Sequence, residues 1–254
     1  MLNMYTLIPC FFYHECLNIR SIFTPRFIKD WFVKRFNTAV FGNELKWYAT
    51  EVEQGKENYT TSDAMVAWCQ THNISIRGHN IVWDDPQFQQ SWLKSLVNQP
   101  QLLRQALMKR LNSIVTRYAG DFLDWDVSNE QLHFSFYEDA LSDPNVSTNL
   151  FLATQEIDPQ AQLFVNDYNT LEEPNDLRVS PDTFIAKVKQ LRDAGVVKLG
   201  IGLESHFGSK PPDLAYIRAT LDKLVVLGYP IWLTELDIDV RSLGNNFTKV
   251  FYLH

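Results

Sequence analysis

The chain has 254 residues, 45% of them hydrophobic and 13% aromatic, which is enough for one large domain with a substantial core. Its net charge of -7 and pI near 5.4 argue against a nucleic-acid binder, because such a surface must be positive to meet phosphates. The three cysteines form no CxxC pair and the six histidines show no ligand spacing, so we expect no disulfide framework, no metal and no cofactor.

Along the chain, the apolar pattern predicts helices that alternate with strands. Helices are expected where apolar residues recur at helical spacing, and strands where short apolar runs end in polar residues. In chain order we expect a helix at 25–36, a strand at 38–43, a helix at 62–72 capped by Thr60, Thr61 or Ser62, a strand at 74–83, a helix at 102–118, a strand at 122–130, a helix at 149–156, a strand at 161–169, a helix at 181–193, a strand at 199–207, a helix at 214–227 and a strand at 230–237.

This alternation predicts the fold class. Strands separated by helices form a parallel sheet, and their even spacing over this length favours a closed (β/α)8 TIM barrel over an open doubly wound sheet. No glycine-rich phosphate loop follows any strand, which argues against nucleotide binding. We therefore predict an α/β protein with a TIM-barrel architecture and no second globular domain.

Polar residues gather where the predicted strands end. In a barrel these ends share one face, on which active sites are built. Glu130 and Glu235 each follow an apolar strand, and two carboxylates about 5–5.5 Å apart are what a retaining glycosidase needs. The alternative for each is a solvated strand end without a catalytic role. The polar residues at the strand ends are Asn43, Lys46, His79, Asn80, Trp83, Asn129, Glu130, Asp167, Tyr168, Glu204, His206, Glu235 and Asp237.

Six ordered blocks resemble glycoside hydrolase family 10, the endo-β-1,4-xylanases, and most closely its plant-type branch. A single N-x-E would be a weak signal, but blocks in family order at strand ends are a specific one. The blocks are NELKWYATE (43–51), RGHNIVW (77–83), WDVSNE (125–130), LFVNDYN (163–169), GIGLESHF (200–207) and PIWLTELDI (230–238).

The resemblance implies a role for most of these residues. Glu130 matches the general acid/base and Glu235 the nucleophile. Asn129 would hydrogen-bond the 2-OH of the cleaved sugar, His206 would hold the nucleophile, and Asp237 would support that network. The remaining matches are substrate contacts: Asn43, Lys46 and His79 on the non-reducing side, Trp83 as a wall of the pocket, and Tyr168 near the leaving group.

The chain departs from the family at several places. Gly42 stands where many members carry Glu, which removes one contact to the distal sugar. Glu204 stands where many relatives have Gln, and it places a third carboxylate near the catalytic pair. Residues 1–22 do not match the family's first strand, and no eighth strand is recognisable. We therefore expect a divergent segment at 1–22 and a partial catalytic barrel at 23–254, with about strands 2–7 recognisable.

The leading functional hypothesis is a retaining endo-1,4-β-xylanase, a glycoside hydrolase that cleaves internal bonds of xylan by double displacement. One alternative is a truncated, inactive relative that at most binds polysaccharide, and another is a barrel hydrolase for glucan or mannan. We expect a monomer with xylan as its partner, and neither nucleic acid nor membrane.

The cellular location follows only from the resemblance. The family implies an extracellular or cell-wall location. Residues 1–18 are apolar but lack a basic leader and a small-residue cleavage site, so they make a poor signal peptide. Four N-x-S/T sequons agree weakly with secretion; they begin at Asn58, Asn73, Asn145 and Asn246.

Overall fold

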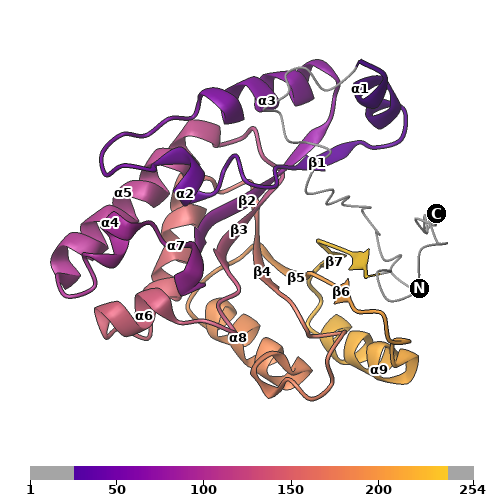
Figure 1. Cartoon of the computed structure of the whole chain (residues 1–254). Helices are drawn as coiled ribbons and strands as arrows, with labels where there is room; N and C mark the ends of the chain where they lie inside the picture. The colour runs from indigo at the N-terminus through magenta and orange to yellow at the C-terminus, as the bar shows by residue number, and fades with distance from the viewer. Residues whose placement is uncertain (1–25, 240–254) are drawn as a thin grey trace.

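The computed structural model describes residues 26–239 of the chain. A curved, six-stranded, all-parallel sheet forms its centre, in the order β1-β2-β3-β4-β5-β7 (Figure 1). The strands are β1 Thr38–Val40, β2 Ser75–Trp83, β3 Asp124–Asn129, β4 Gln162–Asp167, β5 Leu199–Leu203 and β7 Ile231–Leu233. Strands that follow one another in this order along the chain are neighbours in the sheet and run parallel, with at least one helix between them. This arrangement is an incomplete TIM barrel, as predicted.

Helices cover the outer face of the sheet (Figure 1). The helices are α1 Arg26–Val33, α2 Trp47–Thr50, α3 Thr60–Thr71, α4 Ser91–Lys94, α5 Pro100–Tyr118, α6 Phe136–Leu141, α7 Val146–Ile157, α8 Pro181–Asp193 and α9 Leu214–Val225, with 3-10 turns η2 Pro86–Phe88 and η3 Leu177–Val179. Every helix expected from the apolar pattern is present. The pattern did not predict the short helices α2, α4 and α6, because one or two turns contain too few residues to show a period.

Helix α8 begins and ends as its sequence signals require. Pro181 occupies the first turn and the Ser180 hydroxyl accepts a hydrogen bond from the Thr183 amide at 3.2 Å. Gly195 follows the helix with φ of +106°, a conformation that disfavours residues with a Cβ. The expected cap of α3 is wrong: its N-cap is Tyr59, without a side-chain cap. The Ser62 hydroxyl instead donates to the Glu44 carbonyl at 2.6 Å and ties α3 to the loop after β1.

The last two predicted strands are each divided in two. The segment expected at 199–207 forms β5 and then β6 His206–Phe207, and the segment at 230–237 forms β7 and then β8 Asp237–Ile238. β6 and β8 pair in a separate small sheet with His206 opposite Asp237. Ser205, with φ of +69°, turns the chain between β5 and β6. This turn brings the polar residues after the two strands together.

Charged and aromatic side chains fill the interior between the strands. Arg77 of β2 is buried and forms ion pairs with Asp124 and Asp126 of β3. Its guanidinium lies 4.3 Å from the centre of the Phe164 ring, an arrangement that stabilises the cation. Gly78 leaves the space that Trp125 fills, because a Cβ there would overlap the indole ring. Arg77 thus pairs with two carboxylates of β3, the strand that leads to Glu130.

Some predictions concern residues beyond the described part. The segment 1–22 and any strand after residue 239 lie outside it, so their expected divergence or absence stays a prediction. Among residues 26–239, no helix is both long and apolar enough to span a lipid bilayer.

Candidate active site

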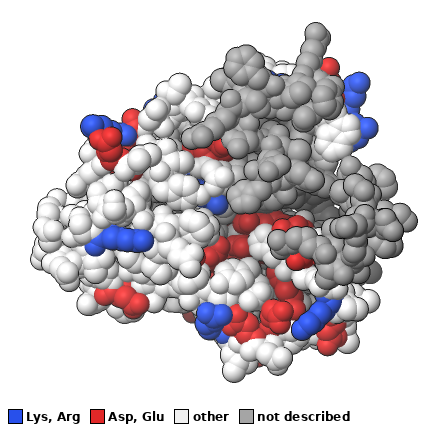
Figure 2. Space-filling model, in the orientation of Figure 1, with Lys and Arg blue, Asp and Glu red and all other residues white. Residues whose placement is uncertain are grey.

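The eleven predicted site residues all lie at or just beyond the carboxyl ends of the parallel strands. Because these ends meet on one face, residues far apart in sequence are neighbours. Figure 2 shows acidic side chains gathered in a hollow at the centre of this face. Most of these side chains contact one another or share a partner.

Glu235 follows β7 and lies among positive and amide groups. Its Oε1 accepts a hydrogen bond from Asn166 Nδ2 at 3.2 Å and lies 3.9 Å from His79 Nδ1. Burial alone would raise the pKa of this carboxyl, but His79, His206 and Lys46 outweigh it and lower the pKa to about 2. Glu235 is therefore ionised at neutral pH, as a nucleophile must be.

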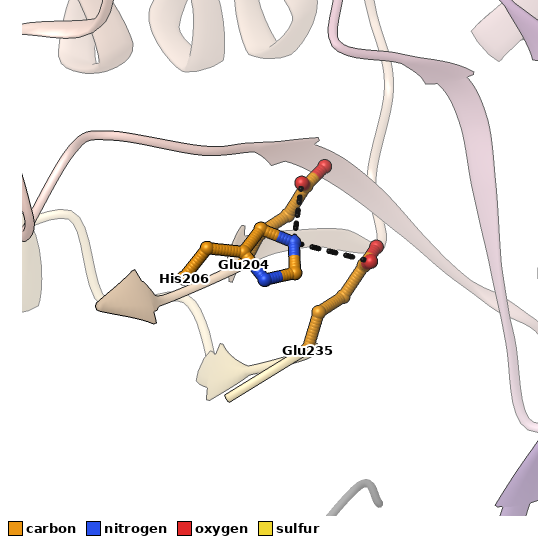
Figure 3. A group of neighbouring side chains, drawn as sticks. All are labelled: Glu204, His206 and Glu235. Carbon is orange, nitrogen blue, oxygen red and sulfur yellow. Dashed lines mark ion pairs between the residues drawn. The ribbon is translucent and has the colours of Figure 1, made fainter. Parts of the chain in front are cut away.

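His206 contacts three carboxyl groups, and Figure 3 shows two of them, those of Glu204 and Glu235. Its Nε2 lies 3.4 Å from Glu204 and 3.6 Å from Glu235, and its Nδ1 lies 3.1 Å from Asp237. Partial burial acts against the cation, yet these acids raise the pKa of His206 to about 12. Ligand atoms of Glu204, His206 and Glu235 lie within 4.8 Å of one another, a spacing that could suit a metal. With the imidazole protonated, these side chains form an ion-pair cluster.

Glu130 follows β3 and has the opposite protonation preference. It is 7% exposed, in a left-handed turn with φ of +56°. Burial first, and then the charges of Asp167 and Glu235, raise its pKa to about 8, against the influence of the Trp83 indole N–H. Glu130 thus keeps its proton at neutral pH, whereas Glu235 loses its own. Two carboxyl groups with divergent pKa values supply an acid and a nucleophile in one site.

Asn166, which the sequence analysis did not single out, lies at the centre of the carboxylate group. Its Nδ2 donates to Asn129 Oδ1 at 2.9 Å and Glu204 Oε1 at 3.0 Å, as well as to Glu235. Its Oδ1 accepts from the Thr234 hydroxyl at 2.6 Å, which fixes the amide orientation. The available signal was a polar residue inside the apolar strand LFVND, because a buried amide needs specific partners.

Glu204 is a third carboxyl beside the pair. It is 2% exposed, and its backbone oxygen accepts from the Glu235 amide at 3.0 Å. Burial and the neighbouring Glu235 raise the pKa of Glu204 well above its ordinary value, despite the hydrogen bond from His206. A protonated Glu204 has nearly the shape and the neutral charge of the Gln expected from the family resemblance.

The loops after β1 and β2 form the other part of the site. The Lys46 ammonium lies 4.4 Å from the centre of the Trp83 ring, and Trp83 stacks on Phe88 at 4.0 Å between ring centres. Burial lowers the pKa of Lys46, although the charges of Glu235 and Glu130 act against this. The Nδ1–H of His79 donates to the Asp126 carboxylate, with 2.9 Å between Nδ1 and Oδ2. This aromatic and cationic wall faces the carboxylates.

Buried Arg110 of α5 holds these two loops from behind, and the sequence analysis missed it. Its guanidinium donates to the carbonyls of Leu45 at 2.5 Å, Ile81 at 2.8 Å and Asn80 at 3.1 Å, and to the Thr50 hydroxyl at 2.9 Å. The first three are backbone groups next to predicted substrate contacts. The sequence of α5 carries no signal that distinguishes Arg110, so only its tertiary contacts identify it.

The last two predicted residues follow β1 and β4. The Asn43 Oδ1 accepts from the Tyr48 hydroxyl at 2.5 Å, and the Asn43 amide donates to Glu44 Oε2 at 3.2 Å. Tyr168 stacks on His133 with 3.7 Å between the ring centres. Burial, and then the charges of Glu130 and Asp167, raise the pKa of Tyr168 to about 12, so Tyr168 lies near the carboxylates.

Comparison with known proteins agrees with this geometry. The sequence model for "Glycosyl hydrolase family 10" matches residues 13–250. Two proteins of Arabidopsis thaliana are similar: Endo-1,4-beta-xylanase 5-like is 41% identical over 83% of this chain, and Endo-1,4-beta-xylanase 3 is 45% identical over 92%. The solved structure of native xylanase10C from Cellvibrio japonicus aligns over 91% of this chain with a TM-score of 0.76 and 25% identity.

The chain is much shorter than these proteins. It spans 37% of Endo-1,4-beta-xylanase 5-like, 30% of Endo-1,4-beta-xylanase 3 and 51% of the xylanase10C chain. The likeness therefore concerns one catalytic-type barrel within longer proteins.

Proposed function

This chain belongs to glycosyl hydrolase family 10, and from that premise we propose that it is a retaining endo-1,4-β-xylanase. Its partner would be xylan, and its place would be extracellular, where cell-wall xylan lies. The observation that carries the proposal is the divergence of the two carboxyl groups at the ends of β3 and β7. The pKa of Glu130 is raised to about 8 and that of Glu235 is lowered to about 2.

In the first step, Glu130 protonates the glycosidic oxygen as the bond to the leaving sugar breaks. The Glu235 carboxylate attacks the anomeric carbon from the opposite face and forms a covalent glycosyl ester. Hydrogen bonds and charge from Asn166, His206 and His79 hold Glu235 in its ionised form. The proton of Glu130 is available because burial disfavours its charged form.

In the second step, a water molecule attacks the anomeric carbon of the ester. Glu130, now a carboxylate, takes the proton of that water, and Glu235 leaves in its original charge state. Two inversions at one carbon give net retention. The enzyme returns to its starting protonation, so no other proton donor is required.

Binding of the sugar chain falls to both parts of the site. Lys46, His79 and Asn43 provide hydrogen-bond partners for sugar hydroxyls on the non-reducing side, beside the Trp83 wall. Asn129, whose Nδ2 lies 3.3 Å from Glu130 Oε1, would hydrogen-bond the 2-OH as positive charge develops on the ring. Tyr168 would contact the leaving sugar. Residues 23–254 would form the catalytic barrel.

The proposal is tested with soluble arabinoxylan and purified chain. Glu130→Ala and Glu235→Ala should each lower the hydrolysis rate by at least about a hundredfold, and proton NMR should detect the β-anomer as the first product. Activity that neither substitution changes would contradict the assignment, and an α-anomer would contradict retention.

Affinity electrophoresis through a gel that contains xylan tests the remaining alternative in parallel. Retardation without hydrolysis would identify a polysaccharide-binding protein instead of an enzyme. A panel with β-glucan and mannan in place of xylan tests the third reading, which predicts a preference for one of these polymers.

A further inference from the structure

The turn that carries Glu130 also contains a histidine. The amides of His133 and Phe134 donate to the Glu130 carbonyl at 3.1 and 3.0 Å, and they close the left-handed turn. The position of the Glu130 carboxyl therefore depends on where His133 lies. The side chain of His133 is fully buried, so its partners are protein groups.

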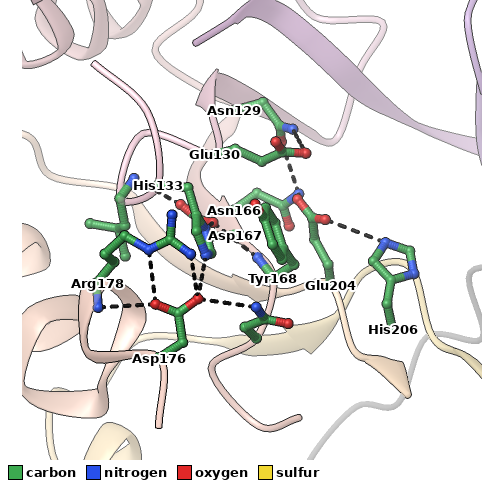
Figure 4. A network of polar contacts seen from close by, with 12 residues as sticks. Asn129, Glu130, His133, Asn166, Asp167, Tyr168, Asp176, Arg178, Glu204 and His206 are labelled. Carbon is green, nitrogen blue, oxygen red and sulfur yellow. Dashed lines mark hydrogen bonds and ion pairs between the residues drawn. The ribbon is translucent and has the colours of Figure 1, made fainter. Parts of the chain in front are cut away.

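Both ring nitrogens of His133 face carboxylates (Figure 4). Nδ1 lies 2.5 Å from Asp167 Oδ1, at the end of β4, and Nε2 lies 3.0 Å from Asp176 Oδ2, in the loop before η3. An ionised carboxylate only accepts hydrogen bonds, so both ring nitrogens must donate. An imidazole that donates from both nitrogens carries a positive charge.

The other donors around the two acids favour their ionised forms. Asp167 also accepts from the amides of Leu132 at 2.8 Å and Tyr168 at 3.0 Å. Asp167 is deeply buried, and burial raises its pKa, but these amides and His133 act against that rise. Two backbone N–H donors favour the charged form of Asp167, so we assign the negative charge to Asp167 and the positive charge to the imidazole.

Asp176 has its own set of donors. Its carboxylate accepts from Asn169 Nδ2 at 3.1 Å and from Arg178 at 2.8 and 2.9 Å. The hydrogen bond to Arg178 is the main cause that holds the pKa of Asp176 below its ordinary value. Burial acts against a charge on His133, yet Asp167 and Asp176 together raise its pKa.

The Tyr168 ring provides a second constraint on His133. The two rings are nearly parallel, 2° apart in plane angle, with 3.7 Å between centres. A cation on the face of an aromatic ring is attracted by the ring electrons. One face of Tyr168 is therefore used by His133, which fixes the ring on the leaving-group side of the site.

We propose that His133 is a positioning residue, a buried imidazolium clamped between Asp167 and Asp176, which locks the turn of Glu130 to the exit of β4. It keeps the acid and the Tyr168 ring in one relative position. This inference rests on the proposed role of Glu130 as the acid. His133 does not touch the reacting atoms; it acts through Glu130 and Tyr168.

The charges that face His133 come from three places. Asp167 lies at the end of β4, Asp176 lies just before η3, and Arg178 lies within η3. The Asp167 charge raises the pKa of Glu130, and a cation beside Asp167 limits that effect. The clamp thus combines a fixed turn with a nearly balanced local charge.

The charge is tested by long-range nitrogen–proton NMR on the full chain labelled with 15N-histidine. The His133 signals are assigned by their loss in His133→Gln. We expect both ring nitrogens to remain protonated above the ordinary imidazole pKa of about 6.5, and the titration to move to lower pH in Asp176→Asn. A neutral ring with a pKa near the ordinary value of about 6.5 would overturn the proposal.

The positioning role is tested with two substrates. Dinitrophenolate leaves without a proton, so 2,4-dinitrophenyl β-xylobioside needs Glu130 far less than xylan does for cleavage of the first bond. His133→Gln and Asp176→Asn should slow xylan hydrolysis by about 10- to 100-fold and initial dinitrophenolate release by less than about threefold. His72→Gln, at the exposed histidine that caps the C-terminus of α3, is the control and should change neither rate.

An equal loss on both substrates, or none, would overturn the positioning role. If the wild-type chain cleaves neither substrate, the proposed enzymatic function fails. The NMR titration separates the two failures, because the charge of His133 is measured without turnover, and a neutral His133 would then overturn the clamp as well.

Discussion

The two sides of the site are held in place by different chemistry. The β1–β2 side, formed by Asn43, Lys46, His79 and Trp83, is fixed from behind by Arg110, whose main acceptors are neutral backbone carbonyls. The β3–β7 side, formed by Glu130, Asn166, Glu204 and Glu235, is fixed by hydrogen bonds among groups that change charge.

The difference separates substrate placement from chemistry. Carbonyl acceptors do not titrate, so the contacts that Arg110 makes with the β1–β2 side do not depend on the charge of their acceptors. The β3–β7 side depends on which carboxyl holds a proton, because each charge shifts the pKa of its neighbours. In the proposed enzyme, the second side would restrict catalysis to the pH range in which Glu130 is protonated and Glu235 is not.

The largest effect is expected from Arg110→Met. It leaves several buried acceptors without a donor, so the free energy of unfolding should fall by about 4 kcal/mol, as measured by urea denaturation. The loss should be equal at mildly acid and at neutral pH, since the carbonyl acceptors do not titrate. Arg104→Met, on the same helix with an exposed ion pair to Asp143, is the control and should cost less than about 1 kcal/mol. A loss that varies with pH would refute the comparison.

Asn166→Asp should have the next largest effect, because it replaces the shared amide donor with a fourth carboxyl of equal shape. We expect kcat/KM on xylan to fall by about 10²-fold. The acid limb of the pH profile should move to higher pH, since the new charge raises the pKa of Glu235. The same substitution at exposed Asn149 of α7 should leave the profile unchanged. An unshifted acid limb would show that Asn166 has no electrostatic role.

Glu204→Gln should have little effect on activity at pH 6, within about threefold, since glutamine resembles the protonated acid. Its effect on stability depends on pH. The unfolded chain loses the Glu204 proton near the ordinary pKa while the folded chain keeps it, so wild-type stability falls as pH rises above that value. The variant lacks this loss. The urea midpoint of the variant should therefore rise relative to that of the wild type from pH 5 to pH 8. A constant difference between the two midpoints would contradict a protonated Glu204.

The smallest effect is expected on the β1–β2 side. No atom lies within 4 Å of a Cβ built at Gly42, so Gly42→Glu fits without strain. One additional charged hydrogen bond to the distal sugar should lower KM for xylohexaose by about fivefold and leave kcat unchanged. Gly42→Ala is the control for loss of the glycine itself. A change in kcat instead of KM would mean that this position affects the chemistry.

The sequence was sufficient for the longer helices and the strands of the parallel sheet, but not for the short helices α2, α4 and α6. Alternation of strands and helices predicted the parallel sheet, and carboxyl-terminal strand residues predicted which side chains meet. The positions it missed share a property. Asn166, Arg110 and His133 act through partners 29 or more residues away in the chain, and no local pattern encodes such a pairing.

The sequence by itself determined which residue types stand at each strand exit, because parallel strands place their carboxyl ends on one edge. Only the tertiary structure decided which of the carboxyl groups keeps its proton. Burial and neighbouring charges set that preference, and both arise when β3, β4, β5 and β7 lie side by side. Identical Glu side chains at 130 and 235 thus differ in chemistry because their surroundings differ.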